Sequence, residues 1–244
     1  MDAVIIALAS GKGGTGNTTS AAFIGGALAG LGRQVALVEL AEGQRSVDII
    51  AGVSGQTVFD LDDVLSGRSA PGKALAQSPH HPGLHVISAP YSGGCIEPER
   101  VRLLCTRLRP HFDFILLDTR AGLGPAFEAA REACHRMILL ATPDPVALRD
   151  ARQLADHFGR KDAQLRLILN RVDRARLQQD GLLEDLDEAI DLVGVQLLGV
   201  IPESTAIARA GGTGSPLKTG SDEAKVFSAI ARRITGEDVP LVFS

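Results

Sequence analysis

The sequence is poor in cysteine and has no long apolar run. Its 244 residues include three scattered cysteines with no CxxC spacing, which argues against a disulfide scaffold and against a zinc site. No run approaches the roughly 18 apolar residues of a membrane-spanning helix. The start, MDAVIIALAS, lacks the basic residues and the apolar length of a signal peptide. These absences lead us to expect a cytoplasmic protein.

An excess of charge of either sign is also missing. The chain carries 25 basic and 29 acidic residues, a formal net charge of −4, so it has no overall attraction for a nucleic-acid backbone or an anionic membrane. A predicted helix does hold Arg100, Arg102, Arg107 and Arg109, but a solvent-exposed helix face explains such a run more simply than a DNA-binding patch does. Nucleic acid is therefore not a favoured partner.

Short apolar runs alternate with longer amphipathic stretches along the whole chain, which indicates an α/β protein. Most short runs are continuous, so we expect a doubly wound, mainly parallel sheet with helices on both faces. The predicted strands are Ala3–Ala9, Gln34–Leu40, His85–Ala89, Phe112–Asp118, Arg136–Thr142, Leu165–Asn170 and Gln196–Ile201. The predicted helices are Thr18–Leu31, Asp60–Ser66, Glu97–Leu108, Pro125–Cys134, Pro145–Phe158, Leu182–Leu192, Ser204–Ala210 and Asp222–Ile234. Because no linker or repeat divides the chain, we expect a single domain over residues 1–244.

A glycine-rich segment, SGKGGTGNTT, separates the first predicted strand from the first predicted helix. A turn of this kind points backbone N–H groups and the positive helix end at one place, which suits a phosphate chain. By position Thr18 would offer its hydroxyl to Mg²⁺ and Thr19 would reach a neighbouring phosphate, while helix capping is the simpler alternative for both. The candidate residues for binding ATP are Gly11, Lys12, Gly13, Gly14, Thr15, Gly16, Asn17, Thr18 and Thr19.

One position departs from the standard phosphate-binding pattern GxxxxGK[ST]. Gly11 to Thr18 reads GKGGTGNT, so Asn17 stands where the pattern has a lysine. A charge-assisted phosphate contact contributes roughly 1.5–3 kcal/mol, so we expect ATP binding to be weakened by about one to two powers of ten or more. Backbone donors, Mg²⁺ and Lys12 remain, and weak or conditional binding of ATP with Mg²⁺ is the expectation.

Lys12, the second residue of the loop, makes the loop similar to that of a known protein family. The run KGGTGNTT is similar to KGGxGKTT, the signature of the MinD/ParA family of deviant Walker A P-loop ATPases. In that family the early lysine reaches across a nucleotide-sandwiched dimer to the partner's phosphates. The resemblance therefore implies the P-loop NTPase fold, a trans contact for Lys12 and a nucleotide-dependent homodimer. It covers nearly the whole chain and is closest to the MinD branch, which positions bacterial cell division.

Residues 38–51, VELAEGQRSVDIIA, resemble the family's switch region, usually IDxDxGLRNLDLI. Glu39 replaces the first Asp, and Ala41 stands where the family has its water-positioning Asp. Glu42, one residue along, would point to the other side of an extended strand. The positions that match the family pattern are Gly43, Arg45 and Asp48.

Two further resemblances complete the expected site. The strand ending FDFILLDTRAG is similar to the family's Walker B strand, so Asp118 is the expected outer-sphere partner of Mg²⁺. A cap for the next turn is the alternative role for this Asp. The segments that resemble the family's adenine-binding ones are Asn170-Arg171 and Pro202-Glu203.

The departures at Asn17 and Ala41 fall on the two side chains that hydrolysis most needs, and without the switch Asp nothing holds the attacking water. The resemblance implies an ATP-binding switch or weak ATPase in division-site placement or related spatial positioning. A pseudo-ATPase adaptor without turnover stays open as an alternative, and so does a ParA-like DNA partition factor. The expected partners are a second copy of the chain and a protein of unidentified kind.

The last nine residues, GEDVPLVFS, include acidic Glu237 and Asp238, and no basic residue follows Arg233. Members of the MinD branch usually end in a basic amphipathic helix that lies on the membrane. This tail has neither the length nor the charge of such an anchor, so we expect no autonomous membrane anchor in this sequence.

Overall fold

The computed structural model describes residues 2–41, 43–91, 94, 96–159, 164–173 and 186–242. Within these residues eight strands form one sheet in the order β3-β4-β2-β5-β1-β6-β7-β8. Every pairing is parallel except that of β3 with β4. The predicted α/β class with a mainly parallel sheet is confirmed. The strands are β1 (Val4–Ser10), β2 (Val35–Glu39), β3 (Ala76–Gln77), β4 (Leu84–Ile87), β5 (Phe114–Asp118), β6 (Arg136–Ala141), β7 (Leu165–Val172) and β8 (Leu197–Pro202).

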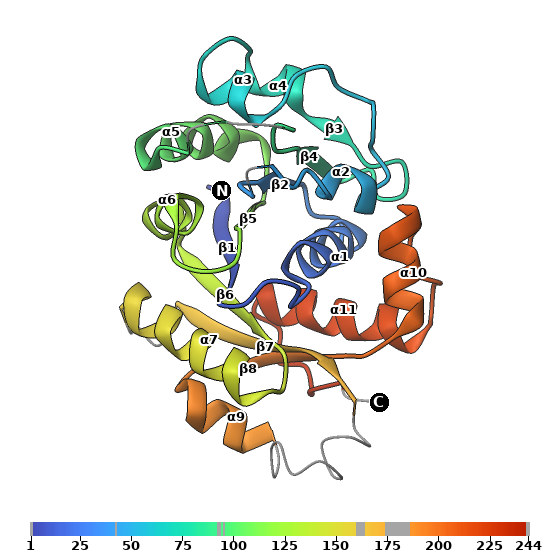
Figure 1. Ribbon diagram of the computed structural model, residues 1–244. Coiled ribbons are helices and arrows are strands. Elements are labelled where there is room, and N and C mark those ends of the chain that lie inside the picture. The colour runs from blue at the N-terminus through green and yellow to red at the C-terminus, as the bar shows by residue number, and fades with distance from the viewer. Residues whose placement is uncertain are drawn as a thin grey trace.

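Helices cover both faces of this sheet (Figure 1). One face carries α3 (Leu61–Leu65), α4 (Pro71–Ala74), α5 (Pro98–Leu108), α6 (Pro125–Ala133), α7 (Pro145–Phe158) and α9 (Leu186–Val193). The other carries α1 (Asn17–Gly30), α2 (Val47–Ile50), α10 (Thr205–Thr213) and α11 (Asp222–Ile234). Among the described residues, no helix combines the length and the apolar character needed to cross a membrane.

The strands read as unbroken apolar runs because both of their faces are buried. In β1, Ile5 and Ala7 belong to the hydrophobic cluster under α5, α6 and α7, whereas Ile6 and Leu8 belong to the cluster under α1 and α11. Successive strand residues point to opposite faces, so each strand contributes to both clusters. The sheet is thereby fixed between two layers of helices, and its strand ends become rigid positions for the loops.

The structure differs from the sequence prediction in a few short elements. The elements β3, α2 and α4 were not predicted, because each has two to four residues and is too short to show a period. The strand expected to reach Ala89 ends at Ile87, since the Ala89 amide leaves the sheet and donates to Glu39 Oε2 at 3.0 Å. The helix predicted from Leu182 is seen from Leu186 onward, and its first four residues lie outside the described ones.

Gly212 of α10 and Gly214, which caps the carboxyl end of that helix, offer a test of this packing. Gly214 ends the helix with φ at 64°, and a Cβ there would lie 2.4 Å from the Ile49 carbonyl oxygen of α2. Replacing it with alanine should destabilise the protein by about 2 kcal/mol or more, through both strain and the clash. Gly212 has open space around its Cα, so Gly212→Ala should stabilise by roughly 0.5–1 kcal/mol. Urea unfolding of both variants checks this, and equal effects would contradict the packing of α10 on α2.

Candidate functional site

The glycine loop joins the carboxyl end of β1 to the start of α1 and lies near the middle of the view in Figure 1. Gly14 and Gly16 have φ values of 80° and 86°, and a Cβ on Gly16 would lie 2.3 Å from Asn170 Nδ2. No side chain caps α1, so helix capping by Thr18 or Thr19 is not what the structure shows. The N–H groups of the first turn are thus left for another acceptor, and the loop forms a cradle suited to an anion.

Asn17, the residue in the lysine position, is turned inward. Its Nδ2 donates to Asp118 Oδ1 at 2.7 Å and to the carbonyl oxygens of Leu8 and Thr119, both at 3.0 Å. An amide nitrogen carries two hydrogens, so these three acceptors share them. The side chain is 8 % exposed and joins the start of α1 to β1 and to the end of β5. In this arrangement Asn17 is a structural crosslink through its Nδ2.

Asp118 is fully buried at the carboxyl end of β5, and its Oδ2 has no hydrogen-bond partner among the described residues. The pKa of Asp118 is raised to about 7, chiefly by burial and in part by the Glu39 carboxyl, while hydrogen bonding to Thr18 and Asn17 opposes the rise. A buried carboxylate with one open oxygen, beside the Thr18 hydroxyl, is a donor set that suits a divalent cation such as Mg²⁺. The residues present therefore fit the metal part of Mg-ATP.

Glu39 is the last residue of β2 and pairs in register with Asp118 of β5. The Glu39 side chain nevertheless lies in a different environment from that of Asp118. Its Oε1 accepts from the Ser46 and Val47 amides at 2.7 and 3.2 Å, while its Oε2 accepts from Ala89. Burial raises the pKa of Glu39, and these three backbone hydrogen bonds oppose that rise. The Glu39 side chain thus fastens the switch segment to the sheet. Sequence reasoning treated Glu39 only as a departure and missed this role.

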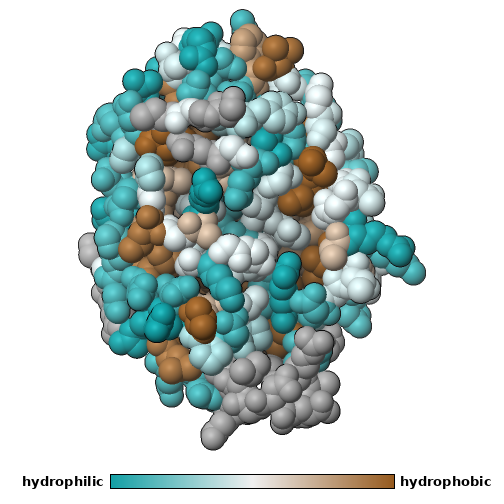
Figure 2. Space-filling view, in the orientation of Figure 1, coloured by the Kyte–Doolittle hydropathy of each residue, from teal (hydrophilic) through white to brown (hydrophobic). Residues whose placement is uncertain are grey.

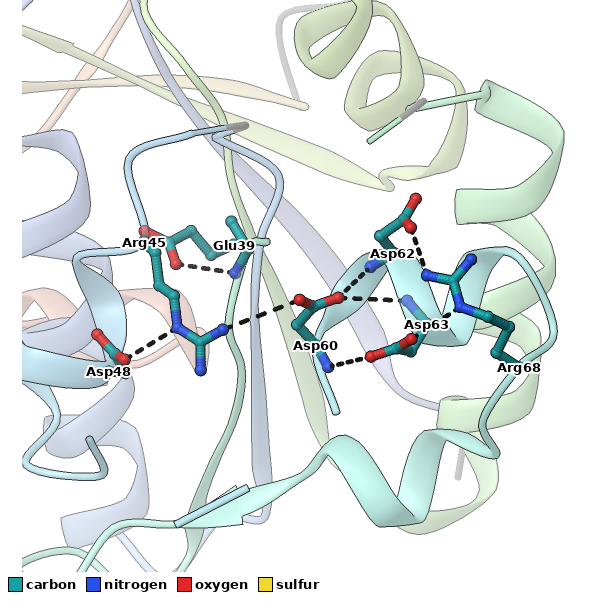
Figure 3. A network of polar contacts seen from close by, with 8 residues as sticks. Glu39, Arg45, Asp48, Asp60, Asp62, Asp63 and Arg68 are labelled. Atoms are coloured by element: carbon teal, nitrogen blue, oxygen red, sulfur yellow. Dashed lines mark hydrogen bonds and ion pairs between the residues drawn. The ribbon is translucent and has the colours of Figure 1, made fainter. Parts of the chain in front are cut away.

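Arg45 is the second residue that organises the switch segment (Figure 3). Its Nε lies 3.2 Å from Asp48 Oδ2, and its guanidinium lies 3.9 Å from Asp60 Oδ2 and 4.1 Å from the centre of the Tyr91 ring. The side chain is only 9 % exposed, and the backbone has the uncommon φ of 35°. The match of Arg45 and Asp48 to the family pattern was the signal that this pair matters, and the structure shows the contact.

Ala41 follows β2 and is buried, with its carbonyl accepting from the Gln44 amide at 3.2 Å. A methyl group cannot orient a water molecule, so the structure offers no substitute at this position itself. Glu42, the neighbouring acid considered from the sequence, lies outside the described residues.

Lys12 is half exposed, and its Nζ lies 3.7 Å from Asp144 Oδ1. Asp144 caps α7 by accepting from the Ala147 amide, so the lysine rests on the start of that helix. A Cβ on Gly11 would lie 2.4 Å from Asp150 Cβ, which shows how closely the loop packs on α7. Lys12 is therefore accessible at the rim of the cradle, and its trans contact stays a prediction.

The two predicted adenine segments lie side by side, because Val172 of β7 pairs with Pro202 of β8 and the Glu203 amide donates to the Val172 carbonyl at 3.1 Å. Asn170 is 6 % exposed and donates from Nδ2 to the Thr15 carbonyl at 2.6 Å, so its side chain supports the loop. Arg171 is exposed, with φ at 56° and its amide donating to Asn170 Oδ1. All the predicted segments thus converge on one edge of the sheet.

The remaining sequence candidates do not converge there. On α5, Arg100 pairs with Glu97 and Arg102 pairs with Glu99, as expected for a solvated helix face. In the described part of the chain, no group of three or more His, Cys, Asp and Glu side chains could hold a metal ion. Figure 2, seen from the side of Figure 1, shows hydrophobic residues in separate patches among polar ones.

The comparisons with known proteins agree with this geometry. Residues 6–217 match the family model described as the CobQ/CobB/MinD/ParA nucleotide binding domain, and the chain belongs to this family. It is 32 % identical to the septum site-determining protein MinD of Thermotoga maritima, over 97 % of this chain and 90 % of that protein. MinD of Bacillus subtilis is 31 % identical, with the same two coverages of 97 % and 90 %.

Solved structures show the same relationship. The MinC:MinD cell division protein complex of Aquifex aeolicus aligns with a TM-score of 0.90 and 30 % identity, covering 98 % of both chains. MinD of Pyrococcus horikoshii, solved with Mg-ADP, aligns with a TM-score of 0.81 and 28 % identity, covering 95 % of this chain and 96 % of that one. The fold is therefore the P-loop NTPase fold of the MinD proteins.

The buried Asp118 leads to a pH prediction for the protein without nucleotide or metal. Its native pKa is raised above the unfolded value, so the native state binds the extra proton and loses stability as pH rises from about 4 through about 7. Asp118→Asn removes that loss, and its melting temperature relative to the parent should rise by several °C between pH 5 and pH 8. Calorimetry in EDTA checks this, with Asp113→Asn as the exposed control. A pH-independent difference would contradict the raised pKa.

Proposed function

We propose that this chain is a MinD-type nucleotide switch that acts in division-site placement, with weak ATP turnover. The observation that carries the proposal is the cradle formed by Gly11 to Thr18 next to the half-satisfied Asp118, at the edge where Asn170 and Pro202 also lie. Support comes from relatives that are named septum site-determining proteins. The match with this chain covers 90 % of the length of each of them.

The nucleotide would be held mainly by the backbone. The loop amides and the first turn of α1 would bind the phosphates, while Thr18 and Asp118 would hold Mg²⁺, one through its hydroxyl and the other through a bound water. When bound, Mg²⁺ neutralises phosphate charge. The chain's own contribution is a rigid cradle whose rim carries Lys12.

A pseudo-ATPase adaptor is the second candidate, and a specific observation favours it. The side chain at the lysine position is committed to Leu8, Asp118 and Thr119, and the side chain at the water-positioning site is a methyl group. In both candidates we propose a second copy of this chain and a protein of the MinC type as partners, since the A. aeolicus structure pairs MinD with MinC. Phosphate release separates the two candidates.

The first test restores both missing groups. Asn17→Lys should tighten ATP binding by about tenfold or more, since it returns an ammonium to the phosphates, and it should leave turnover low. Ala41→Asp alone should do little, because the nucleotide is still held weakly. The double variant should release phosphate faster than the two single effects combined, since both groups serve one transition state. Steady-state phosphate release is measured for the parent and the three variants.

Two controls make this test decisive. Asn17→Ala removes the crosslink without adding charge, so tighter ATP binding in this variant would mean that the ammonium is not the cause. Turnover of the parent at the rate of the double variant would show that Asn17 and Ala41 are compatible with full catalysis, and the proposal of weak turnover would be wrong.

The second test concerns Lys12. If its ammonium crosses a dimer interface, light scattering should show a dimer of the parent with ATP and Mg²⁺ and a monomer without them. Lys12→Ala should remain a monomer in both conditions, while Lys73→Ala, an exposed lysine of α4, should behave like the parent. A dimer of Lys12→Ala with ATP, or a parent dimer that ignores nucleotide, would remove the trans role.

A further inference from the structure

The segment that joins β5 to α6, residues 119–124, is fastened to the glycine loop (Figure 1). Near its start, the Thr119 carbonyl accepts from Asn17 Nδ2 at 3.0 Å. Three residues further on, the Gly122 amide donates to the carbonyl of Ser10, the last residue of β1, at 2.8 Å. Arg120 lies between these two attachments. Its backbone is therefore held next to the cradle on both sides.

The Arg120 side chain is a cation that the rest of the described structure does not use. It is exposed, and among the described residues it forms neither a hydrogen bond nor an ion pair. Lys12, at the rim of the same cradle, instead lies 3.7 Å from Asp144 Oδ1. A guanidinium has five N–H donors and keeps its charge at any physiological pH. The Arg120 side chain is thus available to an anion bound in the cradle.

The order of the strands fixes the direction in which a nucleotide would lie. The described sheet runs β5-β1-β6-β7-β8, and the proposed adenine segments follow β7 and β8, while the glycine loop follows β1. A nucleotide with its base at β7 and β8 and its phosphates in the loop would extend its phosphate chain toward β5. Its terminal phosphate would then be the group nearest the segment that follows β5, which carries Arg120.

A terminal phosphate at this place needs a cation. It is the most highly charged group of the nucleotide, and the strand that leads to the segment ends in the buried Asp118 carboxyl, with Glu39 in register beside it. Asn17, in the lysine position, supplies no charge. A planar guanidinium fork matches two oxygens of a phosphate, so arginine is well suited to such a contact.

We propose that Arg120 binds the terminal phosphate of ATP and makes the site prefer a nucleoside triphosphate to a diphosphate. ADP lacks the terminal phosphate, so it would not make this contact. The inference rests on the proposed function, because it uses the cradle and the adenine segments assigned there. It gives Arg120 part of the role that the missing lysine charge leaves open.

The test compares two nucleotides. The full-length chain is titrated by calorimetry with the non-hydrolysable ATP analogue AMPPNP and with ADP, each with Mg²⁺. Arg120→Gln should raise the dissociation constant for AMPPNP by about tenfold or more and leave that for ADP unchanged, while Arg120→Lys, which keeps the charge but loses the fork, should lie between. In ¹⁵N-labelled protein, the Arg120 Nε–Hε NMR signal should shift strongly with AMPPNP and little with ADP.

Arg107→Gln is the matched control. Arg107 is also exposed and without a partner among the described residues, but it stands in the last turn of α5, which leads to the first residues of β5. This variant removes the same charge and should bind both nucleotides like the parent. Because Arg120 has no contact to lose, the melting temperature of nucleotide-free Arg120→Gln should equal that of the parent, which excludes misfolding as the cause of weaker binding.

The comparison is repeated in the Asn17→Lys background, so that the effect of Arg120 is measured even where the parent binds weakly. Arg120→Gln that binds AMPPNP like its background, or that loses AMPPNP and ADP equally, would overturn the inference and leave the proposed function standing. Binding of neither nucleotide by the parent and by Asn17→Lys would overturn the proposed function, and the role of Arg120 with it.

Discussion

The buried hydrogen bond between Asn17 and Asp118 is the constraint on which the site geometry depends. It links the first residue of α1 to the last residue of β5, and the same amide also reaches Leu8 of β1. Three elements that are distant in the sequence are thereby held at one point in a medium where hydrogen bonds to a carboxylate are strong. The cost of this arrangement is a fully buried carboxylate that is satisfied on one oxygen only.

Two neighbouring carboxylates at this edge show how local contacts decide the role of a residue. Glu39 and Asp118 are register partners at the ends of β2 and β5, and both are fully buried. Three backbone amides satisfy Glu39, so it holds the switch segment in place. Asp118 has an open oxygen instead, and a cation is the partner that would complete its environment.

The switch segment and the loop are therefore supported by different contacts. The Arg45 side chain links α2 to the start of α3 through Asp48 and Asp60, and it packs on the Tyr91 ring. Asn170 of β7 supports the glycine loop by donating a hydrogen bond to the Thr15 carbonyl. Both residues lie at positions recognised from family patterns, but their observed contacts are structural. A residue in a binding motif can thus stabilise the site without facing the ligand.

The sequence by itself determined the α/β class, the longer helices and strands, and the loop as the place for phosphate. Continuous apolar runs and glycines are local signals that do not require knowledge of distant residues. Only the tertiary structure decided that Asn17 points to Asp118 and that Glu39 binds the amides of Ser46 and Ala89. These contacts join residues up to about a hundred positions apart, and parallel register, which no local pattern encodes, brings them together.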